Sequence, residues 1–211
     1  MLAGSNLQPK HLNSGGGLLY YKMEIRNFEQ DLNNSKNLNE EWKRVLKKAF
    51  DENIEVVFKD DNTSQLGFGV DIIITTKQGR RYTIEHKTRR FDYLGHNEYI
   101  LEIAHHRYSD EECKNKLSTI PGWLYKGTFD YIFIGTLNEQ GNKIIEVVGF
   151  SSIPFKLEEF KSEYNNLKNG WAKSKFSSGN FQLTLNKKVT KEFLEENANK
   201  FWYWREDNEN I

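Results

Sequence analysis

The chain has 211 residues, in which 30 lysines and arginines balance 30 aspartates and glutamates, so its formal net charge is zero. This balance excludes any argument that the protein binds nucleic acid because it is basic as a whole. The length suffices for one domain with a substantial hydrophobic core. Cys113 is the only cysteine, which excludes an intrachain disulfide and fits a cytoplasmic protein. No apolar run approaches the length of a membrane span, so we expect no membrane partner.

The first 22 residues show no hydrophobic period and include the run Asn-Ser-Gly-Gly-Gly at positions 13–17. Such a run is typical of a flexible segment. We therefore expect residues 1–22 to be a flexible leader, with Met23 as a candidate for the original start. Residues 23–211 are expected to form a single α/β domain with a mixed central β-sheet flanked by helices.

Residues 37–50 are predicted to form the first helix, with Asn37 as a candidate N-cap and Glu40 three positions further on. A strand over 54–59 and a polar loop over 60–65 follow. The helix prediction rests on apolar side chains that recur at helical spacing, namely Leu38, Trp42, Val45, Leu46 and Ala49.

Two runs rich in β-type residues then flank a turn signal. Residues 70–76 are mostly β-branched, and residues 82–88 alternate in type. Between them, the sequence Lys-Gln-Gly at 77–79 suits a three-residue hairpin loop whose last position is left-handed, where Gly79 is the easiest residue to place.

This loop length fixes which side chains meet across the hairpin. If Thr76 pairs with Arg80, Asp71 lies directly opposite Glu85, and directly opposed residues share one face of a sheet. Lys87 is two residues beyond Glu85 and shares that face as well. A two-residue loop would instead set Asp71 opposite the next residue along and scatter the three side chains.

Two neighbouring carboxylates repel each other unless a cation lies between them. Oxygen ligands suit Mg²⁺ or Mn²⁺, which usually retain waters and accept substrate phosphates as further ligands. A lysine beside such a site can orient or deprotonate water, or stabilise charge during in-line displacement at phosphorus. Asp71, Glu85 and Lys87 therefore indicate metal-assisted hydrolysis of a phosphodiester.

With Asp71 followed by Glu85-His86-Lys87, the hairpin resembles the PD-(D/E)XK nuclease superfamily, although Val70 stands where the family name has proline. The resemblance implies a restriction-endonuclease-like fold and a Mg²⁺- or Mn²⁺-dependent endonuclease acting on DNA. It also implies that the His86 backbone carbonyl is a further metal ligand. An acidic residue of the first helix often joins the metal site in this superfamily, which makes Glu41 a candidate ligand. The alternative is an ordinary charge near the positive end of a helix dipole.

Six basic residues and one acidic residue lie between positions 77 and 90, a local surplus beside the predicted site. Arg80, Arg81, Arg89 and Arg90 are therefore candidates for phosphate contacts, as an alternative to a merely solubilising patch.

A loop is expected over 91–98 and a strand over 98–105, in which Glu102 stands alone among apolar neighbours. A lone carboxylate in such a strand is either exposed by alternation or held by a partner such as Lys87, Arg89 or a metal. Glu102 is therefore a second candidate ligand. His105 and His106 at the strand end are candidates for phosphate contact or an ordinary polar pair.

The remaining chain is predicted to contain a buried strand over 131–134, a strand over 144–153, a helix over 157–167 and a helix over 191–200 capped by Thr190. The segment Pro-Gly-Trp-Leu-Tyr-Lys at 121–126, followed by Asp-Tyr before the apolar strand, resembles phage and mobile-element members of the same superfamily. Residues 170–181 mix basic, aromatic and small residues, as in a loop that follows a nucleic-acid backbone or in an ordinary surface loop. Four aromatics at 201–204 are expected to pack on the domain or to form a homodimer contact.

Two other functions remain open at this stage. A nuclease of the same fold that cleaves RNA would use similar metal chemistry but would contact the 2′-hydroxyl. A non-catalytic nucleic-acid-binding module would have no need of Asp71, Glu85 and Lys87 together.

Overall fold

The computed structural model describes residues 26–27, 38–50, 53–59, 70–176 and 178–206. The expected leader, the start at Met23, the Asn37 cap and the polar segment 60–65 lie outside these ranges. Within them, no helix is long and apolar enough to cross a membrane.

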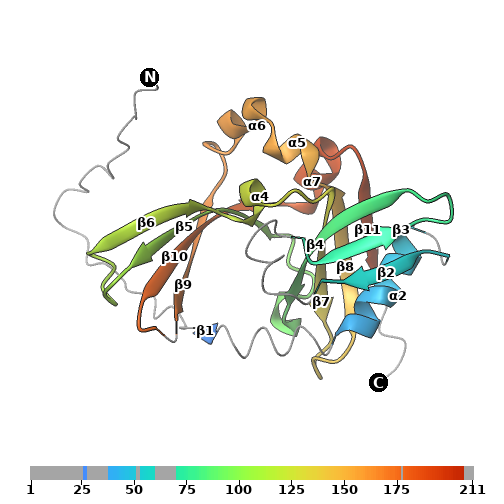
Figure 1. Ribbon diagram of the computed structural model, residues 1–211, viewed down its shortest axis with the longest axis horizontal. Coiled ribbons are helices and arrows are strands. Elements are labelled where there is room, and N and C mark those ends of the chain that lie inside the picture. The colour runs from blue at the N-terminus through green and yellow to red at the C-terminus, as the bar shows by residue number, and fades with distance from the viewer. Residues whose placement is uncertain (1–25, 28–37, 51–52, 60–69, 177, 207–211) are drawn as a thin grey trace.

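The protein has an α/β fold with a mixed six-stranded central sheet and a second, five-stranded sheet beside it (Figure 1). The central sheet is mixed because β4 pairs with β7 in parallel, whereas its other neighbouring strands are antiparallel. Its strands, in spatial order, are β11 (Phe201–Arg205), β8 (Ile144–Ser151), β7 (Tyr131–Leu137), β4 (Arg81–Arg89), β3 (Ile72–Thr75) and β2 (Glu55–Phe58).

The second sheet is built from strands that are distant in sequence. Their spatial order is β1 (Arg26–Asn27), β9 (Asn169–Lys175), β10 (Phe181–Val189), β5 (Tyr99–Tyr108) and β6 (Lys116–Pro121). The helices are α2 (Asn39–Phe50), α4 (Trp123–Lys126), α5 (Ile153–Lys156), α6 (Glu158–Glu163), α7 (Lys191–Asn197) and the 3₁₀ turn η1 (Phe91–Tyr93).

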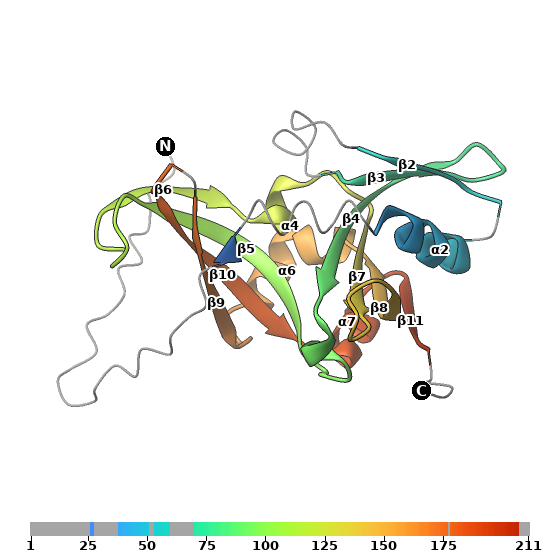
Figure 2. The same ribbon diagram turned by 90° about the horizontal axis from the view of Figure 1, so that it is seen from below.

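Helix α2 covers one face of the central sheet, as Figure 2 shows from below. Its fully buried Trp42 and Leu46 pack against Ile72, Ile74 and Ile84 of the β3–β4 hairpin. The burial of these apolar side chains follows from the helical spacing of α2 and from the alternation of the two strands.

A second hydrophobic cluster joins the opposite face of the central sheet to the second sheet. Tyr99 and Leu101 of β5 pack here with Ile132 of β7 and with Leu124 of α4. Helices α4 to α7 lie above the junction of the two sheets in Figure 1. The core is therefore shared, and it brings strand β5 close to the face of β4 that α2 leaves free.

The predicted hairpin register is confirmed. Ile72 pairs with Ile84, Thr75 with Arg81, and the amide of Thr76 donates to the carbonyl of Arg80 at 2.8 Å. Gly79 has a φ of 75°, the left-handed conformation that the three-residue loop requires.

Several element predictions were wrong or too long. Residues 170–181 are mainly strand, because β9 and the start of β10 pair with each other in the second sheet. The helix expected over 157–167 is α6 alone, only six residues long. The aromatics at 201–204 pack on the domain as expected, and they do so as the edge strand β11, in which the Trp202 indole donates to the Ala49 carbonyl at 3.0 Å. The Thr190 cap is confirmed by its hydrogen bond from the Phe193 amide.

Candidate active site

Strand β4 presents two different faces. Ile84 is buried against α2, whereas Glu85 and Lys87 project from the opposite face, toward α4 and β5. Glu85 is only 3% exposed, so a carboxyl group has been placed within the protein rather than on a solvated surface. Such a group needs a charged or hydrogen-bonding partner.

Asp71 immediately precedes β3 and continues its ladder, since its amide donates to the Ile84 carbonyl at 3.1 Å. This bond is one residue out of the hairpin register, in which Ile84 pairs with Ile72, so Asp71 is not set directly opposite Glu85 as predicted. Its carboxyl group nevertheless lies beside that of Glu85. The amide of His86 donates to Oδ2 of Asp71 at 3.1 Å. Nδ1 of His86 lies 3.1 Å from the same oxygen without forming a hydrogen bond.

Lys87 completes the cluster. Its Nζ lies 2.5 Å from Oε1 of Glu85, although the Lys87 side chain as a whole is 43% exposed. The ammonium also lies 5.8 Å from the centre of the Trp123 ring. The three residues predicted to form the site are therefore brought together on one face of the hairpin.

The pKa values of the two carboxyl groups differ widely. Burial opposes the charge of Asp71, but contacts with His86 and the charge of Lys87 lower its pKa to about 2. Burial raises the pKa of Glu85 to about 8 against the opposing charge of Lys87, and the negative charge of Asp71 adds to the increase. Without a bound cation at neutral pH, Asp71 is ionised and Glu85 retains a proton.

Lys87 is held in its charged form. Burial opposes the charge, but Glu85, Asp71 and Glu102 together outweigh that effect and raise the pKa of Lys87. In this state Lys87 acts as a cation and a hydrogen-bond donor rather than as a proton acceptor.

Glu102 of β5 belongs to the same neighbourhood and is held by partners of its own. Its Oε1 accepts a hydrogen bond from the Trp123 amide at 3.2 Å and lies 2.8 Å from Nε2 of His105. Burial opposes its charge, but His105, Lys87 and the Trp123 amide lower the pKa of Glu102. The structure thus supplies the partner that a lone carboxylate in this strand requires.

The other ring nitrogen of His105 has partners of its own. Its Nδ1 lies 2.8 Å from Nε2 of Gln182 and 3.0 Å from Oγ1 of Thr184, both on β10. If the Gln182 amide donates to Nδ1, Nε2 carries the proton that faces Glu102. Sequence reasoning missed this chain of contacts because Gln182 lies far from His105 along the sequence.

Lys156 of α5 is a second cation near Glu85 that the sequence did not reveal. Its Nζ donates to the carbonyls of Gly127 and Phe129 at 3.0 and 2.9 Å. Burial lowers the pKa of Lys156 to about 8 in spite of the nearby charges of Asp130 and Glu85. These two carbonyl contacts indicate that Lys156 fixes the loop before β7.

The donor set fits a divalent cation of the Mg²⁺ type, with Asp71 and Glu85 as the side-chain ligands. Among the described residues, no group of three or more His, Cys, Asp or Glu side chains is arranged to hold a metal ion. The remaining ligands would be waters, substrate phosphate oxygens or the main chain, such as the His86 carbonyl. A cation bound by this pair would displace the proton that burial favours on Glu85.

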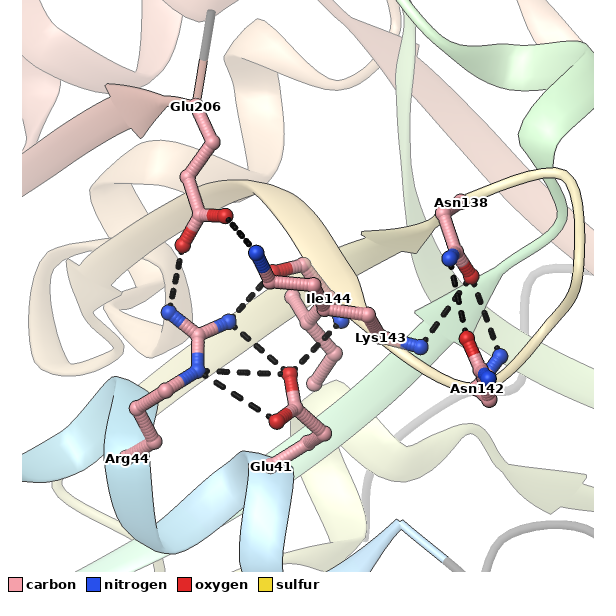
Figure 3. Close-up of polar contacts among 7 residues, drawn as sticks. All are labelled: Glu41, Arg44, Asn138, Asn142, Lys143, Ile144 and Glu206. Atoms are coloured by element: carbon pink, nitrogen blue, oxygen red, sulfur yellow. Dashed lines mark hydrogen bonds and ion pairs between the residues drawn. The ribbon is translucent and has the colours of Figure 1, made fainter. Parts of the chain in front are cut away.

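Glu41 is not brought to this cluster. It lies on α2, which packs on the other face of the central sheet, and its Oε2 accepts from Nη2 of Arg44 at 2.9 Å and from the Ile144 amide at 3.0 Å. Figure 3 shows Arg44 reaching on to Glu206, with Lys143 on the far side of that carboxylate. These contacts join the helix to the β7–β8 hairpin and to the end of β11, so we assign Glu41 a structural role.

The four candidate phosphate-binding arginines differ in their surroundings. Arg80 and Arg81 are exposed at the hairpin tip, and Arg90 is exposed beyond the end of β4. Arg89 is instead enclosed, since Nη2 lies 3.1 Å from Oε2 of Glu146 and the guanidinium stacks on the ring of Tyr99 at 4.4 Å. Only 12% of the Arg89 side chain is exposed, which corrects the expectation that it contacts phosphate.

No family model, curated protein or solved structure matches this chain.

Proposed function

We propose that the protein is a divalent-metal-dependent endonuclease that hydrolyses phosphodiester bonds in DNA, with Mg²⁺ or Mn²⁺ as its cofactor. The observation that carries the proposal is the placement of Glu85, which is 3% exposed yet lies beside Asp71 and 2.5 Å from Lys87. An ordinary surface ion pair contributes little to stability and needs no burial. A buried acid pair with an adjacent ammonium is costly to maintain and is the arrangement expected of a cation site.

Each residue has a separate task in this proposal. Asp71 and Glu85 would hold the cation, whose positive charge would polarise the phosphate and make water more acidic. Lys87 keeps its proton, so it orients the attacking water or stabilises charge on the phosphate oxygens rather than accepting a proton. Glu102, whose Oε1 is fixed by His105 and the Trp123 amide, adds a negative charge that attracts the Lys87 ammonium and helps to position it.

The resemblance of Asp71 and Glu85-His86-Lys87 to the PD-(D/E)XK pattern supports DNA as the substrate and suggests a phage or mobile-element context. The exposed Arg80, Arg81 and Arg90 supply positive charge at both ends of β4, as phosphate binding would need.

The test is cleavage of supercoiled plasmid by the purified protein with Mg²⁺, with Mn²⁺ and with EDTA. Asp71→Asn and Lys87→Ala are compared with the wild type, after circular dichroism has shown that each variant is folded. We expect cleavage that requires the cation and that both substitutions abolish. The matched controls are Glu139→Gln and Lys47→Ala, which each remove one charge of the same sign at an exposed position and should leave cleavage intact.

Cleavage that persists in Asp71→Asn would overturn the assignment of the site. Absence of cleavage by the wild type with either cation, on plasmid, single-stranded DNA and RNA alike, would overturn the enzyme proposal. Cleavage of RNA but not of DNA would retain the site and replace the substrate, because the metal chemistry is similar while recognition of the 2′-hydroxyl differs.

A further inference from the structure

The second sheet carries a concentration of positive charge that the neutral composition of the chain conceals. Its strands β5, β6, β9 and β10 contain six lysines and arginines against a single acidic residue, Glu102. The six basic residues are Arg107, Lys116, Lys173, Lys175, Lys187 and Lys188. A local field of this sign favours an anionic partner even when the whole protein is neutral.

Strand register gathers basic and aromatic residues on one face of this sheet. Trp171, Lys173 and Lys175 alternate along β9 and therefore point to the same side. Across β10 they oppose Leu185, Leu183 and Phe181, and the register continues from Leu183 to His106 and from Phe181 to Tyr108 on β5. We call these side chains of β5, β9 and β10 the basic–aromatic face.

The aromatic side chains of this face include an exposed pair. Trp171 is 48% exposed, and its ring centre lies 6.0 Å from that of His106, with the two planes tilted by 35°. The ammonium groups of Lys173 and Lys175 lie 5.2 and 5.6 Å from the centre of the Phe181 ring. A large exposed indole bordered by lysines offers both a stacking surface and positive charge.

The acidic residues of the neighbouring turn do not neutralise these lysines. Both carboxylate oxygens of Asp110 accept hydrogen bonds from backbone amides, and Glu112 pairs with Lys114. Lys173 donates to the backbone carbonyl of Glu111 rather than to a carboxylate. Within the described ranges, no carboxylate forms an ion pair with Lys116, Lys173 or Lys175.

We propose that the basic–aromatic face binds single-stranded nucleic acid, with an unpaired base stacked on Trp171 and with phosphates held by Lys173 and Lys175. Stacking on aromatic side chains combined with a basic track is how proteins bind single strands without sequence preference. The bases of a duplex are already stacked on one another, so an intact duplex cannot use Trp171 in this way.

This surface is separate from the Asp71 site. His105 pairs with Thr184 in the sheet register, and the alternation of β5 and β10 places these residues on the side opposite to His106 and Leu183. The binding proposed here therefore does not depend on cleavage at Asp71 and can be measured without a divalent cation.

The experiment is fluorescence anisotropy of labelled 20-nucleotide oligo(dT) and oligo(rU), and of a 20-base-pair duplex, titrated with the full chain in EDTA over a series of salt concentrations. The wild type should bind both single strands more tightly than the duplex. Trp171→Ala should weaken single-strand binding by about fivefold or more, whereas Trp171→Phe, which keeps a ring, should retain most of the affinity. The Lys173→Ala/Lys175→Ala double variant should reduce the slope of log affinity against log salt by about 1.4, or roughly 0.7 for each lost phosphate contact.

Lys47→Ala is the matched charge control, because Lys47 is exposed on α2, away from the second sheet. It should leave both the affinity and the salt slope unchanged. No single-strand binding by the wild type, or equal affinities of wild type and Trp171→Ala, would overturn the proposal. A reduction of the salt slope in Lys47→Ala that is half of that in the Lys173→Ala/Lys175→Ala double variant would also overturn it, since binding would then follow overall charge alone. Binding of only one of the two oligonucleotides would retain the surface and identify the type of strand.

Discussion

Glu85 and Lys87 lie two residues apart on β4, with Nζ of Lys87 2.5 Å from Oε1 of Glu85. The contact joins a buried carboxyl group to an ammonium that also interacts electrostatically with Asp71 and Glu102. A cation that binds Glu85 must therefore compete with both the proton on Glu85 and the ammonium of Lys87. Metal binding and the release of Lys87 toward Glu102 are thus expected to be linked.

Glu85→Gln should separate the structural role of this position from its proposed metal-binding role. The pKa of about 8 makes Glu85 neutral at pH 7 in the folded protein without a cation, so a neutral amide of similar shape should leave the stability at pH 7 unchanged or higher. The variant should, however, lose the stabilisation that Mn²⁺ gives the wild type, which would reach about 2.7 kcal/mol at a concentration 100 times Kd. Thermal unfolding with and without Mn²⁺ measures both effects, and a variant that Mn²⁺ still stabilises fully would exclude Glu85 as a ligand.

The pH dependence of stability without metal should also depend on Glu85. Its pKa is raised from 4.5 to about 8 on folding, so the folded state binds the proton more tightly than the unfolded state. The resulting stabilisation is fully present below pH 4.5 and is lost as the pH rises toward 8, at a rate of at most roughly 1.4 kcal/mol per pH unit. Urea unfolding of the wild type and of Glu85→Gln in EDTA from pH 5 to pH 9 checks this, because the wild type should lose stability relative to the variant over that range. Parallel curves would show that Glu85 titrates normally.

His105 should affect cleavage without contacting the substrate. His105→Ala removes the group that holds Oε1 of Glu102, so Lys87 loses its orientation and kcat should fall by about tenfold to a hundredfold. His105→Gln keeps an N–H group and should recover part of the loss, while the exposed His96→Ala serves as the control. Single-turnover cleavage at saturating DNA distinguishes this role from weaker binding. An effect on KM without an effect on kcat would contradict a positioning role. So would a fall in kcat accompanied by a Tm low enough to leave the variant partly unfolded at the assay temperature.

Glu41 offers a test that separates a structural carboxylate from a ligand. Glu41→Gln weakens the contacts with Arg44 and the Ile144 amide that join α2 to the rest of the protein (Figure 3). It should therefore lower the free energy of unfolding by about 1–3 kcal/mol while leaving Mn²⁺ affinity unchanged. The neighbouring Glu40→Gln is the matched control, because the Glu40 side chain is 82% exposed and should cost almost nothing. A loss of Mn²⁺ affinity in Glu41→Gln but not in Glu40→Gln would show that Glu41 is a metal ligand.

The hairpin that holds the candidate site is predictable from sequence because its determinants are local. Gly79 selects the loop, the β-branched run over 72–75 selects the strand, and the period of two then places Glu85 and Lys87 on one face, with Asp71 directly before the strand. No long-range information is needed for these steps.

The second sheet is not predictable in the same way, because its strands are polar and pair across large distances in sequence. Strand β9 reads Asn-Gly-Trp-Ala-Lys-Ser-Lys, which lacks the apolar alternation of a half-buried strand, and β10 pairs with β5 some eighty positions earlier. Long-range contacts also explain why Glu41 was wrongly predicted to bind metal and Arg89 to bind phosphate. Glu41 contacts Ile144, and Arg89 contacts Glu146, residues that are distant from them in sequence.

The measurement that tests the central claim most directly is the binding of Mn²⁺, followed by electron paramagnetic resonance at pH 8.5, where Glu85 has largely lost its proton. We predict saturable Mn²⁺ binding by the wild type that is weaker at pH 6.5, is lost in both Asp71→Asn and Glu85→Gln, and is retained in Glu41→Gln. Binding that survives both Asp71→Asn and Glu85→Gln, or no binding by the wild type at either pH, would contradict the assignment of this buried pair as a metal site.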